Sequence, residues 1–515
     1  MLASILFAAS LAAAPADADL RAVARLKGEP QTVAAAGLTK ADAPILTIEN
    51  GSAFDPQSPL LRLVIVGAPD DDGRNAHAVV EAVRWFKTRA PGSVRKRWAV
   101  SVLPSAAFDA GDTAQLERWI TFQAPDVLVE IGPVGGPARS AAFTTETTTA
   151  GDAAEAIARL FSTTPRRSAL HDAMTARVGR APLDIARLLA RRYPETPALS
   201  YIPSVAWTST LRLARALNDP SLTAKVREQA SSLVKDGRLP FGNRIQLTAV
   251  AGTMVFAELG GGDLPHALEG ARLAAARNDR GLAEYGQGWT DDMFMTSAIL
   301  ARAGSLPEHR DDLTALSRLL VDYAGRLQRP DGVFMHATDG PFAWGRGNGF
   351  AALGLMEALT ALPQSHPDRA KLLAIFTRQM AGVAAQQSPD GSWRQVIDEP
   401  GAYREETATA MLLSAMARGI RLGWIGRQYL PVVERAWRAL AAHVREDGTL
   451  VDVCTGTGAG PTRRYYLDRQ AITGADDRGG AMALLASMEM MDLVAVRRPS
   501  SRPRGASSSA PRTVR

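Results

Sequence analysis

Residues 170–494 repeat a single pattern, in which segments of helical period alternate with connections rich in Gly, Pro and Asp. In the segment LTALSRLLVDYAGRL, apolar residues recur at every third or fourth position, as on the buried face of an amphipathic helix. Paired helices joined by alternating short and long loops predict an (α/α)6 toroid of helical hairpins, with the long loops gathered at one end of the inner ring. We expect no strand here and about twelve helices, near residues 175–192, 203–216, 219–235, 245–259, 264–277, 291–303, 309–328, 348–362, 366–385, 405–421, 430–444 and 478–494.

A different pattern precedes the helices. Short runs of mainly β-branched residues alternate with segments of helical period, which predicts a small parallel α/β domain. The expected strands are 45–49, 61–67, 98–103 and 127–131. The predicted fold class is therefore multidomain, α/β over residues 42–165 and all-α over residues 170–495.

The order of strand, acidic turn, helix and strand in the N-terminal domain faintly resembles zinc carboxypeptidase-type domains. The metal-binding His and Glu of that family are absent, because the turn after LRLVIVG reads APDDDGRNAH and the run DVLVEIG carries no His. The seven His residues of the chain are scattered, without the spacing of a metal site. We expect no metal, no cofactor, and a domain that serves in packing or positioning.

The two ends of the chain differ in composition from the rest. Residues 1–18 combine an apolar run with small residues in A-x-A spacing, which is typical of a signal peptide and predicts a periplasmic or secreted protein. Residues 497–515 hold six arginines among Ser and Pro, which predicts a disordered tail. The formal net charge is +6, so the remainder is neutral (6 − 6 = 0) and no nucleic-acid partner is expected. No membrane span is expected either.

The motif WTDDMFM places two adjacent carboxyl groups, Asp291 and Asp292, at the start of an expected helix and directly after Trp289. Such a pair could act in acid/base chemistry, with repulsion and burial raising the pKa of one carboxyl group. The alternative is a structural role, in which Thr290 caps the helix and the two acids complement the helix dipole.

The motif WGRGNGF at residues 344–350 sets three polar or aromatic side chains among three glycines, before another expected helix. The planar fork of Arg346 matches a carboxylate. Trp344 offers a flat face to a sugar ring, and Asn348 can bond a hydroxyl group or the loop backbone. The alternative is a glycine-rich entry to a helix with a surface arginine. A dinucleotide site is not expected, because no strand precedes the motif.

Together with DGVFMH (331–336), GSWRQVIDEPGAY (391–403) and REETATAM (404–411), these motifs resemble the unsaturated glycuronyl hydrolases, glycoside hydrolase families 88 and 105. The resemblance covers about residues 200–490. It implies a hydrolase that removes a 4,5-unsaturated uronic acid from oligosaccharides left by polysaccharide lyases. It also implies that Asp291 is the catalytic acid/base and that the substrate contacts include Trp289, Asp292, His336, Trp344, Arg346 and Asn348.

Two departures from the family pattern alter the expected pocket. Asn243 stands where the family carries an Asp ahead of the fourth helix, and the family His before the W-x-D segment is absent. We still place Asn243 among the substrate-binding residues. The matching residues Trp393, Gln395, Asp398 and Glu405 are expected to brace the loops, with Glu405 starting a helix.

The chemistry explains why one carboxyl group can suffice. In an unsaturated uronide the C4=C5 bond and the ring oxygen form an enol ether. Protonation at C4 gives an oxocarbenium ion at C5, which water captures, and the hemiketal then opens and releases the aglycone. A conventional glycosidase instead needs a pair of carboxyl groups about the anomeric carbon.

Two other functions remain open from the sequence. A polysaccharide lyase or conventional glycosidase on the same toroid would need Asp292 or Glu405 as a second group, or a Tyr/His base. A non-catalytic sugar-binding protein would keep the pocket after losing the Asp at position 243. The expected partner in the leading hypothesis is an oligosaccharide with a terminal unsaturated uronic acid.

Overall fold

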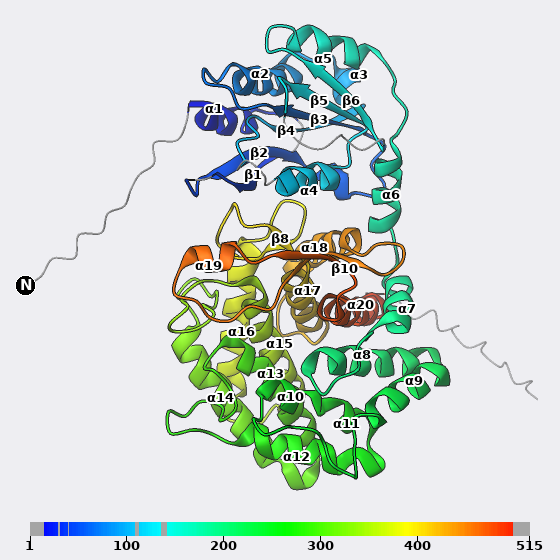
Figure 1. Ribbon diagram of the computed structural model, residues 1–515, viewed down its shortest axis with the longest axis vertical. Helices are drawn as coiled ribbons and strands as arrows, with labels where there is room; N and C mark the ends of the chain where they lie inside the picture. Colours follow the sequence, from blue (N-terminus) through cyan, green and yellow to red (C-terminus); the bar gives the residue numbers. More distant parts are fainter. Residues whose placement is uncertain (1–14, 29–30, 40, 109–112, 135–141, 498–515) are drawn as a thin grey trace, which may run out of the picture.

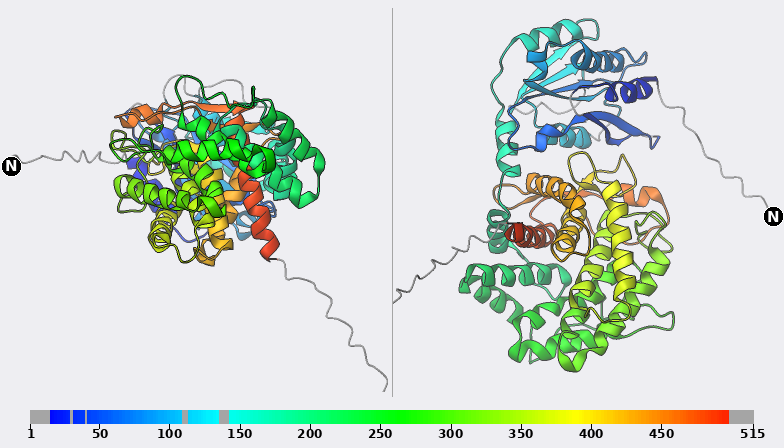
Figure 2. Two further views of the ribbon diagram at one scale, coloured as in Figure 1. Left: turned by 90° about the horizontal axis from the view of Figure 1, so that it is seen from below. Right: turned by 180° about the vertical axis from the view of Figure 1, so that it is seen from behind.

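The computed structural model of the chain describes residues 15–28, 31–39, 41–108, 113–134 and 142–497. An α/β region and a helix-rich region lie one above the other along the longest axis (Figures 1 and 2). The small N-terminal sheet and the helix-rich C-terminal region are thus confirmed. The expected signal peptide lies mostly in residues 1–14 and the expected tail mostly in residues 498–515. Both stretches are outside the described residues, so these two expectations stay predictions.

The N-terminal sheet has six strands in the order β1-β2-β4-β3-β5-β6. Strands β4, β3, β5 and β6 are parallel, whereas β2 is antiparallel to both β1 and β4. The sheet is therefore mixed, and the expectation of a purely parallel layer was wrong. The strands are β1 (Gln31–Leu38), β2 (Pro44–Asn50), β3 (Leu61–Gly67), β4 (Trp98–Leu103), β5 (Val127–Ile131) and β6 (Thr144–Thr148).

Helices cover both faces of this sheet, as the alternation of side chains along each strand requires. Along β3, Leu63 and Ile65 pack on one face against α1 (Pro15–Ala24), α2 (Arg74–Thr88) and α5 (Ala153–Ser162). Val64 and Val66 pack on the other face against α4 (Thr113–Gln123), which lies toward the helix-rich region (Figure 1). A short helix, α3 (Gly92–Arg95), precedes β4.

The inner helices of the C-terminal region form a closed ring of six positions, one of which is filled by two short helices. Each position packs against the next, and the last packs against the first. Each inner position has an outer helix beside it, which is the arrangement of paired helices in a toroid. The inner helices are α8 (Tyr201–Leu217), α10 (Leu247–Gly252) with α11 (Met254–Leu259), α13 (Thr290–Ala303), α15 (Gly345–Ala361), α17 (Glu406–Arg421) and α20 (Asp477–Arg497). The outer helices are α7 (Pro182–Arg192), α9 (Pro220–Ser231), α12 (Leu264–Ala275), α14 (Asp311–Leu327), α16 (Arg369–Ala385) and α18 (Leu430–His443).

Every expected helix is present within a few residues, with two breaks. The segment 175–192 is divided into α6 (Ala169–Val178) and α7, which begins at Pro182, and the segment 245–259 is divided at Thr253. The expectation of no strand after residue 170 was wrong. Short strands occur in the long loops, where pairing with a partner strand replaces a periodic apolar pattern: β7 (Trp393–Arg394), β8 (Arg404–Glu405), β9 (Leu450–Cys454) and β10 (Ala471–Gly474).

Glycines let the inner helices approach closely. A Cβ atom on Gly354 would lie 2.5 Å from the Met293 carbonyl oxygen of α13, and one on Gly349 would lie 2.8 Å from the Cβ of Met411 in α17. The glycines of WGRGNGF that enter α15 have no positive φ angle. These glycines let α15 pack closely against its neighbours, and they do not form a turn in the backbone.

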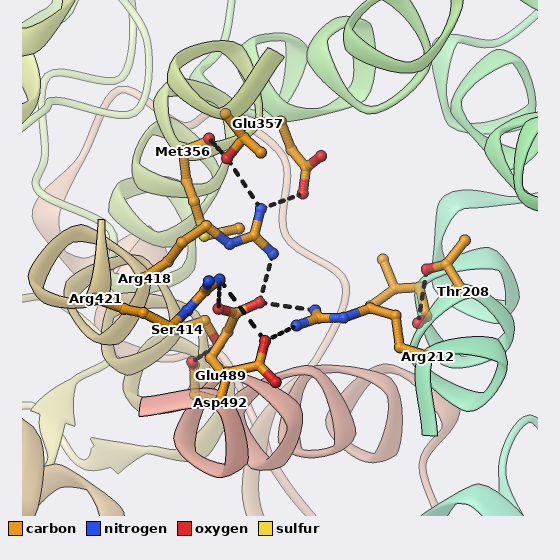
Figure 3. Close-up of polar contacts among 12 residues, drawn as sticks. Thr208, Arg212, Met356, Glu357, Ser414, Arg418, Arg421, Glu489 and Asp492 are labelled. Carbon is orange, nitrogen blue, oxygen red and sulfur yellow. Dashed lines mark hydrogen bonds and ion pairs between the residues drawn. The ribbon is translucent and has the colours of Figure 1, made fainter. Parts of the chain in front are cut away.

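Buried ion pairs connect the inner helices near their C-terminal ends (Figure 3). Glu489 of α20 pairs with Arg418 of α17 and, at 2.7 Å, with Arg212 of α8. Arg418 also lies 3.5 Å from Glu357 of α15. Burial raises the pKa of Glu489, but the two guanidinium groups outweigh this effect and lower it to about 2. The cations also complement the negative ends of the helix dipoles, so this end of the ring is held together electrostatically.

The N-terminal domain rests on the long loops of the toroid, and ion pairs join the two. Arg118 of α4 lies 2.6 Å from Asp452 of β9. Arg404 of β8 lies 2.7 Å from Glu49 of β2 and 3.1 Å from Asp390 in its own loop. A third contact comes from α19 (Arg463–Leu467), in which Arg464 pairs with Asp42. The N-terminal domain therefore holds the loops that carry β8, β9 and α19.

No helix within the described ranges is both long and apolar enough to cross a membrane.

Candidate active site

Charged side chains stand at the N-terminal ends of four inner helices. Asp291 is the second residue of α13, Arg346 of α15 and Arg478 of α20, and Glu405 is the N-cap of α17. The positive ends of these helix dipoles therefore meet at one end of the ring, where the long loops lie. Helix N-termini stabilise anions. This end of the toroid suits a negatively charged ligand.

Asp291 sits at the edge of this region, with 14% of its side chain exposed. Its Oδ2 lies 3.1 Å from Nε2 of His336, which is fully buried. A backbone hydrogen bond joins the start of α13 to the loop that carries His336, because the Thr290 amide donates to the His336 carbonyl at 3.0 Å. The helix begins at Thr290 itself, with Trp289 as its N-cap, so the alternative in which Thr290 caps the helix was wrong.

The second ring nitrogen of His336 is held by Tyr466, whose hydroxyl oxygen lies 2.8 Å from Nδ1. The Gly460 amide donates to that same oxygen at 3.3 Å. In the tautomer in which the phenol donates to Nδ1, Nε2 carries the imidazole proton and donates it to Asp291. Burial is the main cause that raises the pKa of Tyr466 to about 12, which keeps it a phenol. The sequence did not indicate this residue, because nothing local links positions 466 and 336.

Asp292 points away from Asp291 and into the protein. Its Oδ2 accepts from the amides of Gln287 and Gly288, at 3.0 and 2.7 Å, and from the Tyr323 hydroxyl at 2.8 Å. Burial raises its pKa to about 6, against the lowering effect of these hydrogen bonds. The expectation of a substrate contact is revised, because this carboxyl group is 3% exposed and holds the loop that leads into α13.

The aromatic residues of the two motifs stack about His336. Its ring centroid lies 5.3 Å from that of Trp289 and 4.5 Å from that of Trp344. Trp344 is buried, whereas Trp289 is partly exposed. The indole ring with exposed surface is therefore that of Trp289, and not that of Trp344, for which a contact with a sugar ring was expected.

Arg346 is also buried, and both of its terminal nitrogens donate hydrogen bonds to backbone carbonyls. Nη1 donates to the Cys454 carbonyl at 2.5 Å and Nη2 to the Thr455 carbonyl at 2.7 Å, while the guanidinium lies 4.6 Å from the centre of the Trp344 ring. Glu405 supports the same loop by accepting from the Cys454 amide at 2.9 Å. Both residues thus fix residues 454–455, which lie 108–109 positions after Arg346 in the chain.

Arg478 is the more exposed cation at this end of the ring, and the sequence did not single it out. Its side chain is 20% exposed, lies 3.7 Å from Asp476, and donates to the same Cys454 carbonyl at 3.2 Å. The charge of Arg478 also acts on the buried Tyr201 at the start of α8. Burial raises the pKa of Tyr201, while Arg346 and Arg478 oppose the rise.

The remaining expected residues are structural or lie elsewhere. Asn348 is buried and bridges the loop before it, accepting from the Phe334 amide and donating to the Phe334 carbonyl, both at 2.8 Å. Asn243 is exposed in the loop before α10. Glu405 caps α17 through the amides of Thr407 and Ala408, so its predicted role as a helix start and loop brace is confirmed. Similar bracing contacts are made by Trp393, Gln395 and Asp398.

No group of three or more His, Cys, Asp or Glu side chains suited to a metal ion occurs in the part of the chain that the structure describes. The absence of zinc from the N-terminal domain stays a prediction.

Comparison with known proteins finds similarity within the helix-rich region. Glycosyl Hydrolase Family 88 matches residues 279–494, a stretch that holds Asp291, His336, Arg346 and Arg478. A family 105 glycoside hydrolase from C. acetobutylicum has the same fold, with a TM-score of 0.55 and 17% identity, over 61% of this chain and 99% of that one.

Among characterised relatives, the unsaturated rhamnogalacturonyl hydrolase YesR of Bacillus subtilis is 28% identical over 33% of this chain and 50% of its own length. An unsaturated 3S-rhamnoglycuronyl hydrolase of Alteromonas is 27% identical over 39% of this chain and 51% of its own. The chain thus spans about half the length of these relatives. Residues 279–494, less than half of this chain, are thus similar to Glycosyl Hydrolase Family 88.

Proposed function

We propose that this protein is an exported hydrolase that removes a 4,5-unsaturated uronic acid from lyase-generated oligosaccharides, on an (α/α)6 toroid. The observation that carries the proposal is the Asp291 carboxyl group, partly exposed and held at 3.1 Å by an imidazole, at the end of the ring where inner helices begin. The relatives named above support the substrate class, and residues 1–18 support export.

The reaction needs one proton donor, and Asp291 has the required position. In its protonated form it delivers a proton to C4 of the enol ether, and the oxocarbenium ion forms at C5. As the carboxylate, it then takes a proton from the water that attacks C5. His336 holds the carboxyl group in one orientation, because its own ring is fixed by Tyr466. Trp289 offers its partly exposed ring to the sugar.

The geometry favours this chemistry over a conventional glycosidase. The two carboxyl groups that would have to serve as a partner for Asp291 are already engaged. Asp292 accepts three hydrogen bonds from its loop and from Tyr323, and both oxygens of Glu405 accept backbone amides. A single working carboxyl group is sufficient only for the unsaturated substrate.

The carboxylate of the substrate needs a cation, and Arg478 fits this role better than Arg346. Both guanidinium groups share the Cys454 carbonyl, so they lie side by side at the ring end. Arg346 is buried with both terminal nitrogens bonded, whereas Arg478 is partly exposed and its ion pair with Asp476 is long, at 3.7 Å. Arg478 therefore contacts the uronate, and Arg346 holds the loop behind it.

The test is to add the purified protein to lyase digests of pectin, of glycosaminoglycan and of other acidic polysaccharides. The ultraviolet absorbance of the enol ether reports each function differently. A hydrolase of the proposed type consumes the double bond and absorbance falls, and a lyase acting on the intact polymer makes it rise. Release of sugar from these digests with constant absorbance would indicate a conventional glycosidase instead.

A further inference from the structure

Residues 456–461, with the sequence GTGAGP, form a strap that lies against two segments of the candidate active site. A Cβ atom on Gly458 would lie 3.5 Å from Cη2 of Trp289, so the strap meets the edge of the partly exposed indole ring. A Cβ atom on Gly340, in the loop before α15, would lie 3.2 Å from the Gly460 carbonyl oxygen. A sugar ring stacked on Trp289 would therefore lie next to the strap.

The strap is fixed at both ends and loosely held between them. Before it, the Thr455 amide donates to the Gln470 carbonyl at 3.0 Å, and after it Thr462 is the N-cap of α19. Residues 456–461 make no backbone–backbone hydrogen bond to any residue that the structure describes. Three of the six are glycines, which give a backbone more conformational freedom than any other residue. A segment of this kind opens locally at low cost in free energy.

Two tyrosine hydroxyl groups of α19 hold the middle of the strap. The Gly458 amide donates to the Tyr465 hydroxyl oxygen at 3.1 Å, and the Gly460 amide donates to the Tyr466 hydroxyl oxygen at 3.3 Å. The Tyr466 oxygen also lies 2.8 Å from Nδ1 of His336. Hydrogen bonds that share a group in this way polarise and strengthen one another. The position of the strap is thus linked to the position of the imidazole.

The strap also carries unpaired backbone groups. The amides of Gly456, Thr457 and Ala459 have no hydrogen-bond partner among the described residues. Gly456 is exposed, and Thr457 and Ala459 are partly exposed. Backbone amides are among the polar groups that fix the orientation of a ligand in a site. A sugar on Trp289 therefore has hydrogen-bond donors available along the strap beside it.

We propose that the strap opens to admit a sugar to Trp289 and closes over it, and that its closed position holds Tyr466 against His336 through the Gly460 amide. The structure has the strap closed, with Gly460 bonded to Tyr466. Closing of a loop over a bound substrate keeps water out and completes the arrangement of reacting groups. The inference rests on the proposed function, because the sugar is its substrate. Gly460 acts through two other residues and is a positioning residue.

Two glycines of the strap provide a matched pair of variants in the full-length protein. A Cβ atom on Gly460 would lie 2.3 Å from Cδ1 of Tyr465, so Gly460→Ala cannot keep the closed position. A Cβ atom on Gly456 would meet no atom within 4 Å, so Gly456→Ala removes a glycine from the same strap without a clash. Both variants should melt within about 2 °C of the wild type, because no strap residue packs in the hydrophobic core.

Kinetics on a lyase digest that the wild type consumes test the link to His336. Gly460→Ala should lower kcat by about tenfold, and Gly456→Ala should stay within about twofold of the wild type. The double variant Gly460→Ala with Tyr466→Phe should be no more than about twofold slower than Tyr466→Phe, because both changes act on one contact. If Gly460→Ala turns over as fast as Gly456→Ala, or if the two effects multiply in the double variant, the link is wrong.

Hydrogen exchange tests the opening of the strap without any activity. In the substrate-free wild type, the amides of residues 456–460 should exchange at least about 10²-fold faster than those of α15, and Gly460→Ala but not Gly456→Ala should speed the Gly458 amide further. Adding the digest to Asp291→Asn, which does not turn over, should slow strap exchange by about tenfold or more. Strap amides as protected as those of α15 in the substrate-free wild type would overturn the proposal, whether or not the protein hydrolyses an unsaturated uronide.

Discussion

His336 Nε2 lies 3.1 Å from Asp291 Oδ2, although the two residues are 45 positions apart in the chain. The imidazole is held from its other side as well, because the Tyr466 hydroxyl oxygen lies 2.8 Å from Nδ1. A carboxyl group held in this way keeps one orientation toward a bound sugar.

The first prediction concerns the two contacts of His336, with Tyr466 and with Asp291. Tyr466→Phe should lower kcat by about tenfold, the scale of one lost hydrogen bond to a positioned group, with little change in KM. It should also change the pH dependence of kcat, because the Tyr466 hydroxyl no longer holds the imidazole that contacts the Asp291 carboxyl group. Tyr465→Phe is the control, since the Tyr465 hydroxyl accepts from Gly458 and does not touch His336. An unchanged kcat and pH profile in Tyr466→Phe would remove Tyr466 from the account.

A second prediction separates the two arginines at the ring end. Arg478→Ala should raise KM for the acid substrate by about tenfold or more and have a much smaller effect on a substrate whose carboxylate is esterified. Arg346→Lys should impair both substrates alike and lower the melting temperature, because an ammonium group cannot hold two carbonyls with one planar fork. The measurement is kcat/KM of each variant on acid and ester. The reverse pattern would assign the uronate to Arg346.

A third prediction concerns the buried Glu406, whose two carboxyl oxygens have no hydrogen-bond partner within the described residues. Burial, with Glu405 and Asp476 nearby, raises its pKa well above the usual value of 4.5. The folded state therefore favours the protonated form, so stability is lost as pH rises above about 4.5 toward the folded-state pKa. Glu406→Gln should raise the melting temperature at pH 8 by about 2 °C or more and change it little at pH 4. A lower melting temperature at pH 8 would contradict this reasoning.

The domain contact gives a fourth prediction. Arg118→Met removes the guanidinium partner of Asp452, which is 1% exposed and is then left with His443 at 3.9 Å, and should cost about 3 kcal/mol. Because Asp452 begins the segment that holds Arg346, activity should fall together with stability. The double variant with Asp452→Asn should recover most of the stability, as thermal unfolding can show. If Arg118→Met and the wild type have the same melting temperature, the contact between Arg118 and Asp452 does not stabilise the protein.

The helices could be predicted from the sequence because their signal is local. The apolar period of α14 or α18 is visible within a single segment, and the breaks before α7 and after α10 are short irregularities within such segments. The strand β1 was missed because QTVAAAGL has no aromatic residue and only two β-branched residues, Thr32 and Val33, so that its pairing with β2 supplies what its own sequence does not.

The candidate site was predicted only where a role follows from a motif. Asp291 lies at a helix start, as the resemblance implied, and the structure adds its contact with His336. Arg346 differs from expectation because its partners, the carbonyls of residues 454 and 455, lie more than a hundred positions away. Tyr466 and Arg478 were missed for the same reason, since their importance comes from contacts across the ring and not from their neighbours in sequence.

The most direct test of the proposed chemistry compares wild type and Asp291→Asn by the loss of enol-ether absorbance on a purified unsaturated oligosaccharide. The variant must first show the melting temperature of the wild type, so that lost activity is not lost folding. The account predicts that wild type consumes the double bond and that Asp291→Asn is slower by at least about 10²-fold, the usual scale for losing a general acid/base. Equal rates for the two proteins would contradict it.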